Sequence, residues 1–255
     1  MNFFAHQTAA ERYARWRPYF HSLVIEQVKT YLQLTEPVAQ AVDVGCGTGQ
    51  STLALKAIAQ AIIGIDLSPA MLAVAPQDPA LRYIEAPAEA IPLPDDQADL
   101  LTTSLAFHWF DQARFLAEAH RLLKAQGWLV IYNNGFAGQM QGNPAFAQWS
   151  RQTYLARYPS PPRQQQALTV EEAHVAGFHF AHQTRYENEV EFTTEELAAY
   201  FTTQSNVIAA VEQGKENLAD VYAWLVTELT PLFHSAKATF VFGGYIWYLQ
   251  KIVKP

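Results

Sequence analysis

The stretch Ala41-Val42-Asp43-Val44-Gly45-Cys46-Gly47-Thr48-Gly49-Gln50 decides how this chain folds. Its apolar run at 42–44 predicts a buried strand, and a helical pattern begins after the last glycine. Glycine allows positive φ and lets a ligand approach the backbone closely. Because the following helix presents free N–H groups and the positive end of its dipole, the stretch predicts a nucleotide-sized pocket in an α/β protein.

The order of the glycines distinguishes two classes of nucleotide site. The dinucleotide fingerprint is G-x-G-x-x-G/A, but its sixth position counted from Gly45 is Gln50. The third glycine comes one residue early and gives G-x-G-x-G after Asp43. This spacing resembles the first motif of class I methyltransferases, which use S-adenosylmethionine as their cofactor.

Bulk composition limits the class of partner. The chain has 255 residues, enough for one large domain or a domain with an inserted cap. A net charge of −7 argues against a nucleic-acid partner, since phosphate binding relies on clustered Lys and Arg. Cys46 is the only cysteine, so an internal disulfide is excluded and no metal site is expected. The sequence shows neither an apolar run of membrane-spanning length nor a signal pattern, so we expect a cytoplasmic enzyme without a membrane partner.

Strands and helices alternate through the first half of the chain. Strands are expected at 42–44, 61–66, 81–85, 98–104 and 128–132, and helices at 50–59, 69–75 and 114–125. Gly127 is expected to stop the last of these helices. Such alternation predicts a parallel sheet with right-handed connections, covered on both faces.

Residues 8–34 read as helical, with a break near Arg17 because Pro18 follows it. Aromatic and cationic side chains are mixed there. They indicate either an amphipathic lid packed by aromatics or a flap over the cofactor. In the small-molecule methyltransferases that the chain resembles, a Tyr and an Arg-Pro-x-Tyr segment cover the pocket, and Tyr13 and Arg17 are the matching positions.

The second half breaks the alternation. We expect a helical substrate cap at 135–185, a strand at 183–192, a helix to about 203, a long helix at roughly 206–233 and a strand at 239–252. Gly243-Gly244 predicts a bulge or a close approach in that last strand. The organisation expected for a single domain over 1–255 is a lid at 1–35, a cofactor core at 36–134, the cap at 135–185 and the rest of the sheet and helices at 186–255. The resemblance implies a doubly wound, mostly parallel seven-stranded sheet of order 3-2-1-4-5-7-6, with strand 7 antiparallel.

Asp66 is expected to bind the ribose of the cofactor. It ends the second strand, 66 − 49 = 17 residues after the last motif glycine, close to where α/β nucleotide sites place such an acid. The alternative is a helix N-cap, a role for which Ser68 competes. With Asp66 on the ribose, Leu67 and Met71 are expected to pack on the adenine.

Two later segments complete the expected site. The Ala-x-x-Ile-Pro pattern after strand 81–85 resembles the family's second motif, with Ala88 and Glu89 at matching positions, although an exposed acidic loop explains it equally well. In an open sheet the ligand lies where the strand order reverses, so the loops at 45–49 and 105–109 are expected to face one crevice. There His108 and Trp109 match an aromatic pair found in the relatives. His108 is either a proton carrier or a structural histidine.

The sequence thus predicts methyl transfer from S-adenosylmethionine to oxygen or carbon of a small molecule, by in-line displacement. The resemblance includes trans-aconitate and ubiquinone-biosynthesis-type enzymes, so a carboxylate is one candidate acceptor. An NAD(P)-dependent oxidoreductase and a non-catalytic cofactor-binding domain are the alternatives. The expected catalytic residue is His108, and the expected cofactor-binding residues are Tyr13, Arg17, Asp43, Gly45, Cys46, Gly47, Gly49, Asp66, Leu67, Met71, Ala88, Glu89, Leu105 and Trp109.

Overall fold

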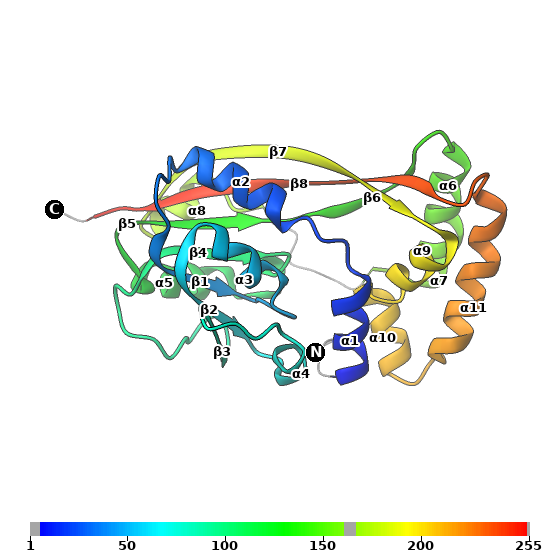
Figure 1. The fold of residues 1–255 in the computed structure, drawn as a ribbon, viewed down its shortest axis with the longest axis horizontal. Coiled ribbons are helices and arrows are strands. Elements are labelled where there is room, and N and C mark those ends of the chain that lie inside the picture. Colours follow the sequence, from blue (N-terminus) through cyan, green and yellow to red (C-terminus); the bar gives the residue numbers. More distant parts are fainter. Residues whose placement is uncertain (1–5, 161–166, 254–255) are drawn as a thin grey trace. The chain divides into compact units, whose positions relative to one another are not determined.

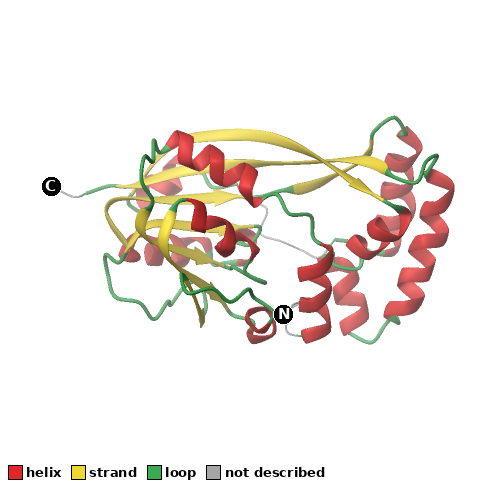
Figure 2. Ribbon diagram, viewed as in Figure 1, coloured by secondary structure: helices red, strands yellow, loops and turns green. Residues whose placement is uncertain are grey.

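The computed structural model describes residues 6–160 and 167–253, which divide into two compact units (Figures 1 and 2). The first, called here the core unit, comprises Tyr19–Asn133, Arg163–Arg185 and Gly244–Pro255. The second, called the aromatic unit, comprises Met1–Pro18, Asn134–Pro162 and Tyr186–Gly243. The division falls inside two long strands, β7 (Phe178–Phe192) and β8 (Ala238–Lys251).

The sheet has the predicted order, with one strand more than expected. Its parallel strands are β1 (Val38–Val44), β2 (Ala59–Asp66), β3 (Leu81–Glu85), β4 (Ala98–Ser104) and β5 (Leu123–Tyr132). The full order is β3-β2-β1-β4-β5-β8-β6, and β7 also pairs with β8. The antiparallel pairing of β8 with β5 confirms the predicted last strand. The sequence did not predict β6 (Gly135–Met140).

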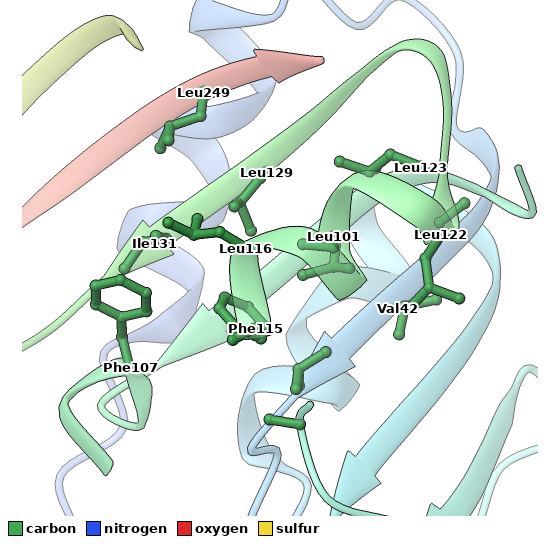
Figure 3. Close-up of a cluster of buried hydrophobic side chains, with 14 of the residues drawn as sticks. Val42, Leu101, Phe107, Phe115, Leu116, Leu122, Leu123, Leu129, Ile131 and Leu249 are labelled. Carbon is green, nitrogen blue, oxygen red and sulfur yellow. The ribbon is translucent and has the colours of Figure 1, made fainter. Parts of the chain in front are cut away.

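Helices cover both faces of the core unit's sheet. On one face lie α2 (His21–Tyr31) and the short α3 (Gln50–Ala54), and α4 (Pro69–Ala73) follows β2. On the other lie α5 (Gln112–Leu122) and α8 (Val170–Val175). Figure 3 shows Leu116 and Phe115 of α5 close to leucine and isoleucine side chains of the sheet. Full burial of each such side chain contributes about 1.5–3 kcal/mol, so this apolar layer fixes the strand ends that carry the site.

The aromatic unit has its own core. It contains α1 (Gln7–Trp16), β6, α6 (Pro144–Trp149), the π-helical turn η3 (Ser150–Tyr154), α7 (Leu155–Arg157), α9 (Thr194–Phe201), α10 (Ser205–Glu212) and α11 (Leu218–Leu229). An aromatic stripe is buried in it: Phe146, Trp149, Tyr154 and Tyr158. Rings from β6, α9 and β8 pack on this stripe.

The predicted cap differs from the observed elements. Within 135–185, residues 135–140 form β6 and 178–185 form the start of β7, so much of the segment is not helical. Residues 167–185 belong to the core unit, while 186–243, predicted as the rest of the sheet and helices, belong to the aromatic unit. Apolar side chains at 178 and 180 already alternate, and the predicted strand began too late to use them. Residues 1–5, 161–166 and 254–255, in the predicted lid, cap and final segment, lie outside the described residues.

Two predicted helix ends are also wrong. The single helix expected at 206–233 is α10 and α11, separated at Gly214, which takes φ +69°, and Asn217 then caps α11 by accepting from the Ala219 N–H. Helix α5 ends at Leu122 rather than at Gly127. The chain is already extended at Leu123, whose register partner is Ala98 of β4, so sheet pairing ends the helix.

Other local signals are confirmed. Helix α1 ends at Trp16, just before the predicted break, and capping boxes that the sequence spells as Thr-x-x-Glu form at Thr169 and Thr193. A Cβ on Gly244 would lie 1.8 Å from the Asn133 carbonyl oxygen, which is the close approach that the paired glycines predicted.

Candidate active site

The glycine loop takes the backbone conformation that its sequence predicted. Gly45, Gly47 and Gly49 have φ values of +70°, +53° and +75°. A Cβ on Gly45 would lie 2.4 Å from the Ala106 Cβ, so this glycine allows the loops after β1 and β4 to touch. A Cβ on Gly47 would meet nothing within 4 Å of the described chain. The loop is therefore packed at Gly45 and has open space beside Gly47, as a cradle for a ligand requires.

Asp66 lies directly against this loop. Its Oδ2 accepts a hydrogen bond from the Gly47 N–H at 2.8 Å, and its Oδ1 accepts one from the Ser68 N–H at 2.8 Å. Ser68 takes the alternative role considered for Asp66, because its Oγ accepts from the Met71 N–H and caps α4. Burial raises the pKa of Asp66, while its backbone donors oppose that rise.

Asp43 is enclosed in the interior rather than open to a pocket. Its carboxylate accepts hydrogen bonds from the hydroxyls of Ser51 at 2.6 Å, Thr52 at 2.7 Å and Thr102 at 2.8 Å. Burial raises the pKa of Asp43, and these donors oppose the rise. The side chain was expected to bind the cofactor; instead it ties the end of β1 to α3 and β4, so its role is to support the glycine loop.

The two side chains predicted to pack on adenine differ in exposure. Leu67 follows Asp66 and is 56% exposed, whereas Met71, in α4, is 3% exposed. Leu67 thus offers an apolar surface next to the proposed ribose acid. The contact of either side chain with adenine stays a prediction.

Cys46 and the segment after β3 lie within the same unit. Burial raises the pKa of the Cys46 thiol well above its ordinary value, which fits a space-filling thiol rather than a nucleophile. Ala88 is buried. Glu89 accepts a hydrogen bond from the Asp111 N–H at 2.8 Å, so the segment resembling the second motif is joined to the loop after β4.

The loop after β4 stands beside the glycine loop, as predicted from the strand order, since Ala106 abuts Gly45. Leu105 has φ +55°, a strained value for a residue with a branched side chain, and its N–H donates to the Tyr132 carbonyl at 3.0 Å. His108 and Trp109 follow in a 3₁₀ turn, η2 (Phe107–Trp109), with ring centroids 4.7 Å apart. Trp109 is 38% exposed.

Tyr13 and Arg17 belong to the aromatic unit rather than to the unit that holds the glycine loop. The Arg17 guanidinium carbon lies 4.6 Å from the centroid of the Tyr13 ring and 5.4 Å from that of Tyr200. Its Nη2 donates to the Thr203 carbonyl at 2.7 Å. These contacts support a helical segment packed by aromatics, and a cofactor contact by Tyr13 or Arg17 stays a prediction.

The sequence did not single out several polar side chains of the core unit. Ser51, Thr52 and Thr102 hold Asp43, and hydroxyls directly after a glycine loop were a readable signal for the first two. His21 Nδ1 lies 3.1 Å from the Tyr132 Oη. No local pattern announces that pair, because its members are 111 residues apart.

Comparison with known proteins also indicates a methyltransferase. Residues 42–131 match the family model described as "Methyltransferase domain". A putative methyltransferase from Dictyostelium discoideum is 29% identical over 136 residues, 53% of this chain and 51% of that protein. The malonyl-[acyl-carrier protein] O-methyltransferase of Serratia marcescens is 33% identical over 109 residues, 42% of each chain. The chain thus spans about half the length of these curated relatives or less.

A solved structure extends the likeness in fold to nearly the whole chain. The structure of a putative type II methyltransferase from Anaeromyxobacter dehalogenans superposes with a TM-score of 0.69. It is 23% identical and covers 94% of this chain and 99% of its own. At 23% identity, this likeness shows that the two chains share a fold and nothing more.

The sheet order and the solved structure give this chain the Rossmann-like fold of methyltransferases, and the segment that contains the glycine loop matches their domain model. Residues 42–131 are therefore its methyltransferase domain. The fold class predicted from the sequence is confirmed, and the domain match supports the predicted cofactor.

Proposed function

We propose that this chain transfers the methyl group of S-adenosylmethionine to oxygen or carbon of a small molecule. The contact between Asp66 and the Gly47 N–H is the main support. It places the proposed ribose acid at a glycine loop with three positive φ values and open space beside its middle glycine. Bound there, S-adenosylmethionine supplies a methyl group already activated by its sulfonium sulfur.

The protein itself holds the cofactor, shields the reacting groups and removes the acceptor's proton. Asp66 accepts hydrogen bonds from ribose hydroxyls, and the N–H groups that open α3 lie next to the loop. Correct placement of two reactants is worth roughly 7–11 kcal/mol of a reaction barrier. Trp109 offers an aromatic face, which stabilises a nearby cation by about 0.5–2 kcal/mol. His108, in the same turn, takes the acceptor's proton where the acceptor carries one.

The lid assignment is part of the same proposal. Tyr13 and Arg17 close over the cofactor in the enzymes that the sequence resembles, and here Arg17 is fixed by Tyr13, Tyr200 and the Thr203 carbonyl. A guanidinium that is already fixed presents its N–H donors at low entropic cost, and such donors suit the carboxylate group of the cofactor. Crosslinking of a photoreactive cofactor analogue to residues 13–17 would support this role.

Three observations bear on the partners and ligands. No helix in the described residues is long and apolar enough to cross a membrane. Within those same residues, no group of three His, Cys, Asp or Glu side chains is placed to hold a metal ion. The acidic net charge of −7 supports a small-molecule acceptor over a nucleic acid. The cytoplasmic location stays a prediction.

Calorimetry tests the first half of the proposal. We expect saturable binding of S-adenosylmethionine and of S-adenosylhomocysteine, and none of NAD or NADP. Binding of a nicotinamide cofactor alone would favour the oxidoreductase alternative.

A labelled-methyl screen tests the second half. The protein is incubated with methyl-labelled S-adenosylmethionine and a small-molecule extract, and labelled products are identified by mass spectrometry. A protein that binds the cofactor but labels no small molecule would favour the non-catalytic alternative.

A further inference from the structure

Three polar side chains lie in a row along the carboxyl edge of β4 and β5. Ser104 is the last residue of β4, and its register partner is Tyr132, the last residue of β5. Partners on neighbouring strands lie about 5 Å apart and project from the same face. His21, at the start of α2, then places Nδ1 3.1 Å from the Tyr132 Oη. The row therefore runs from β4 over β5 to α2.

This row continues the line of the cofactor site. Asp43 and Thr102 are register partners, and a Cβ on Gly45 would touch Ala106, so the end of β4 that carries Ser104 lies beside the glycine loop. Along the sheet edge the sequence of groups is Asp66 on β2, the glycine loop after β1, Ser104 on β4 and Tyr132 on β5. With the ribose at Asp66 and the cofactor over the glycine loop, the next position along the edge is that of the methyl acceptor.

Ser104 has an unused hydrogen-bonding group at this position. Its side chain is 7% exposed, and its Oγ has no hydrogen-bond partner among residues 6–160 and 167–253. A buried hydroxyl left unpaired costs about 1–3 kcal/mol, which a bound polar group would recover. The strained backbone of Leu105 follows at once, and its N–H is fixed to the Tyr132 carbonyl. Strain of this kind gathers at ligand sites.

The row carries no formal charge. Burial lowers the pKa of His21 to about 3, so its imidazole is neutral at physiological pH and a poor proton acceptor. Phe20 lies 4.2 Å from the His21 ring, centroid to centroid, and restricts its movement. His21 is thus a positioning residue that orients the Tyr132 hydroxyl. An uncharged, buried row binds a neutral polar group and penalises an ionised one that lacks a counter-charge.

We propose that Ser104 and Tyr132, oriented by His21, form an uncharged subsite for a neutral hydroxyl group of the methyl acceptor. This inference rests on the proposed methyl transfer and selects oxygen of an alcohol or phenol over a carboxylate, an amine or carbon. In the step, the acceptor oxygen bonds to the methyl carbon and the carbon–sulfur bond breaks, with its electron pair staying on sulfur. The hydroxyl proton passes to His108 and then to solvent.

Binding of three probes of one shape tests the charge preference. Phenol, benzoate and benzylamine present a hydroxyl, a carboxylate and an ammonium on the same ring. Each is titrated at pH 7 into the full-length protein saturated with S-adenosylhomocysteine, with saturation-transfer NMR as the readout. We expect phenol to bind at least fivefold tighter than the other two. Equal affinities, or a preference for benzoate or benzylamine, would overturn the proposal.

Matched variants test the residues. Ser104→Ala and Tyr132→Phe are each expected to weaken phenol binding at least fivefold while leaving the affinity for S-adenosylhomocysteine within twofold. The controls are Thr103→Val, which removes a buried hydroxyl from the opposite face of β4, and Tyr248→Phe, a buried tyrosine of β8 outside the row. Both should bind phenol as the wild type does. An equal loss of phenol affinity in the variants and the controls would show that the row only packs in the core and does not bind the acceptor. Failure of the wild type to bind S-adenosylhomocysteine would instead count against the proposed function itself.

Discussion

The backbone N–H of Gly47 donates to the Asp66 carboxylate at 2.8 Å, and this contact joins the loop after β1 to the end of β2. The two residues come from neighbouring parallel strands, whose carboxyl ends meet at one edge. Because the second Asp66 oxygen accepts from Ser68, the carboxylate is held in place before any ligand arrives. Such pre-organisation lowers the entropic cost of binding.

Replacement of Asp66 by alanine is therefore expected to weaken S-adenosylmethionine binding at least tenfold, about 1.4 kcal/mol, in a calorimetric titration. The matched control is Glu36→Ala, an exposed acid of the core unit that should bind normally. Since burial raises the pKa of Asp66 and only the ionised form accepts two hydroxyl donors, affinity should fall with acidification at a pH above the ordinary range of an aspartate. Unchanged affinity in Asp66→Ala would refute the ribose assignment.

Asp43 is buried beneath the glycine loop and supports it, so its replacement should mainly lower the stability of the fold. Alanine at 43 leaves the hydroxyls of Ser51, Thr52 and Thr102 without their acceptor, and we expect the free energy of unfolding in urea to drop by about 3 kcal/mol. Thr102→Val removes a single donor and should cost only about 1 kcal/mol. Similar losses in the two variants would show that Asp43 is not the centre of this network.

The glycines of the loop differ in what a side chain would meet. A Cβ at Gly49 would lie 2.6 Å from the Tyr83 Oη and 2.9 Å from the Pro76 Cδ, whereas one at Gly47 would enter open space. Gly49→Ala should lower the unfolding free energy by about 2–4 kcal/mol, from strain and clash together. Gly47→Ala should cost only about 1 kcal/mol, the conformational part alone.

For Gly47, the loss of cofactor affinity should be larger than the loss of stability. Its alanine variant is expected to remain folded and yet bind S-adenosylmethionine at least about tenfold more weakly, because the new methyl group occupies the ligand's space. Thermal unfolding and calorimetry on the same preparations measure both quantities. Normal cofactor affinity in Gly47→Ala would show that the open space beside this residue is not the binding site.

The sequence predicted the parts of this molecule that depend on local rules. The G-x-G-x-G spacing, the acid after β2 and the alternation of strands with helices each follow from a short segment. They yielded the parallel sheet and the contact between the loops after β1 and β4, while the family resemblance supplied the strand order. The Ser68 cap and both capping boxes are equally local. Periodicity and turn chemistry determine such features with little help from distant residues.

Features that depend on distant contacts were not predictable. Leu123 leaves the helix because it pairs with Ala98, and 178–185 extends because a sheet edge is available to it. The same holds for the site: Asp43 appeared to face a ligand because it precedes the glycines, but three hydroxyls enclose it. Tertiary structure overrides local preference at these positions.

His108 is expected to act in turnover rather than in cofactor binding. With an acceptor from the labelled-methyl screen, His108→Ala should lower kcat by about 10²–10⁴-fold, the usual range for loss of a general base. Its affinity for S-adenosylmethionine should stay within twofold of the wild type. His174→Ala, at an exposed histidine of α8, is the matched control. Equal turnover in the two variants would make His108 a packing residue.

The buried His21 should make the protein acid-sensitive in a defined window. Its pKa is about 3 in the folded chain and near 6.5 in the unfolded chain, so below pH 6.5 the unfolded state binds more protons. The stability associated with a neutral His21 is therefore complete above pH 6.5 and is lost as the pH falls toward 3. Between pH 7 and 4.5 the loss is on the order of 2–3 kcal/mol.

Urea denaturation of the wild type and of His21→Asn at pH 7 and 4.5 isolates this contribution. Asp43 and Asp66, whose pKa values are raised by burial, act in the opposite direction, but they are common to both proteins and cancel in the comparison. The variant should be less stable than the wild type at pH 7, because it loses the contact with Tyr132, and should lose less stability on acidification. If both proteins lose the same free energy between the two pH values, His21 is not held neutral in the folded chain, and the uncharged character of the row with Ser104 and Tyr132 fails with it.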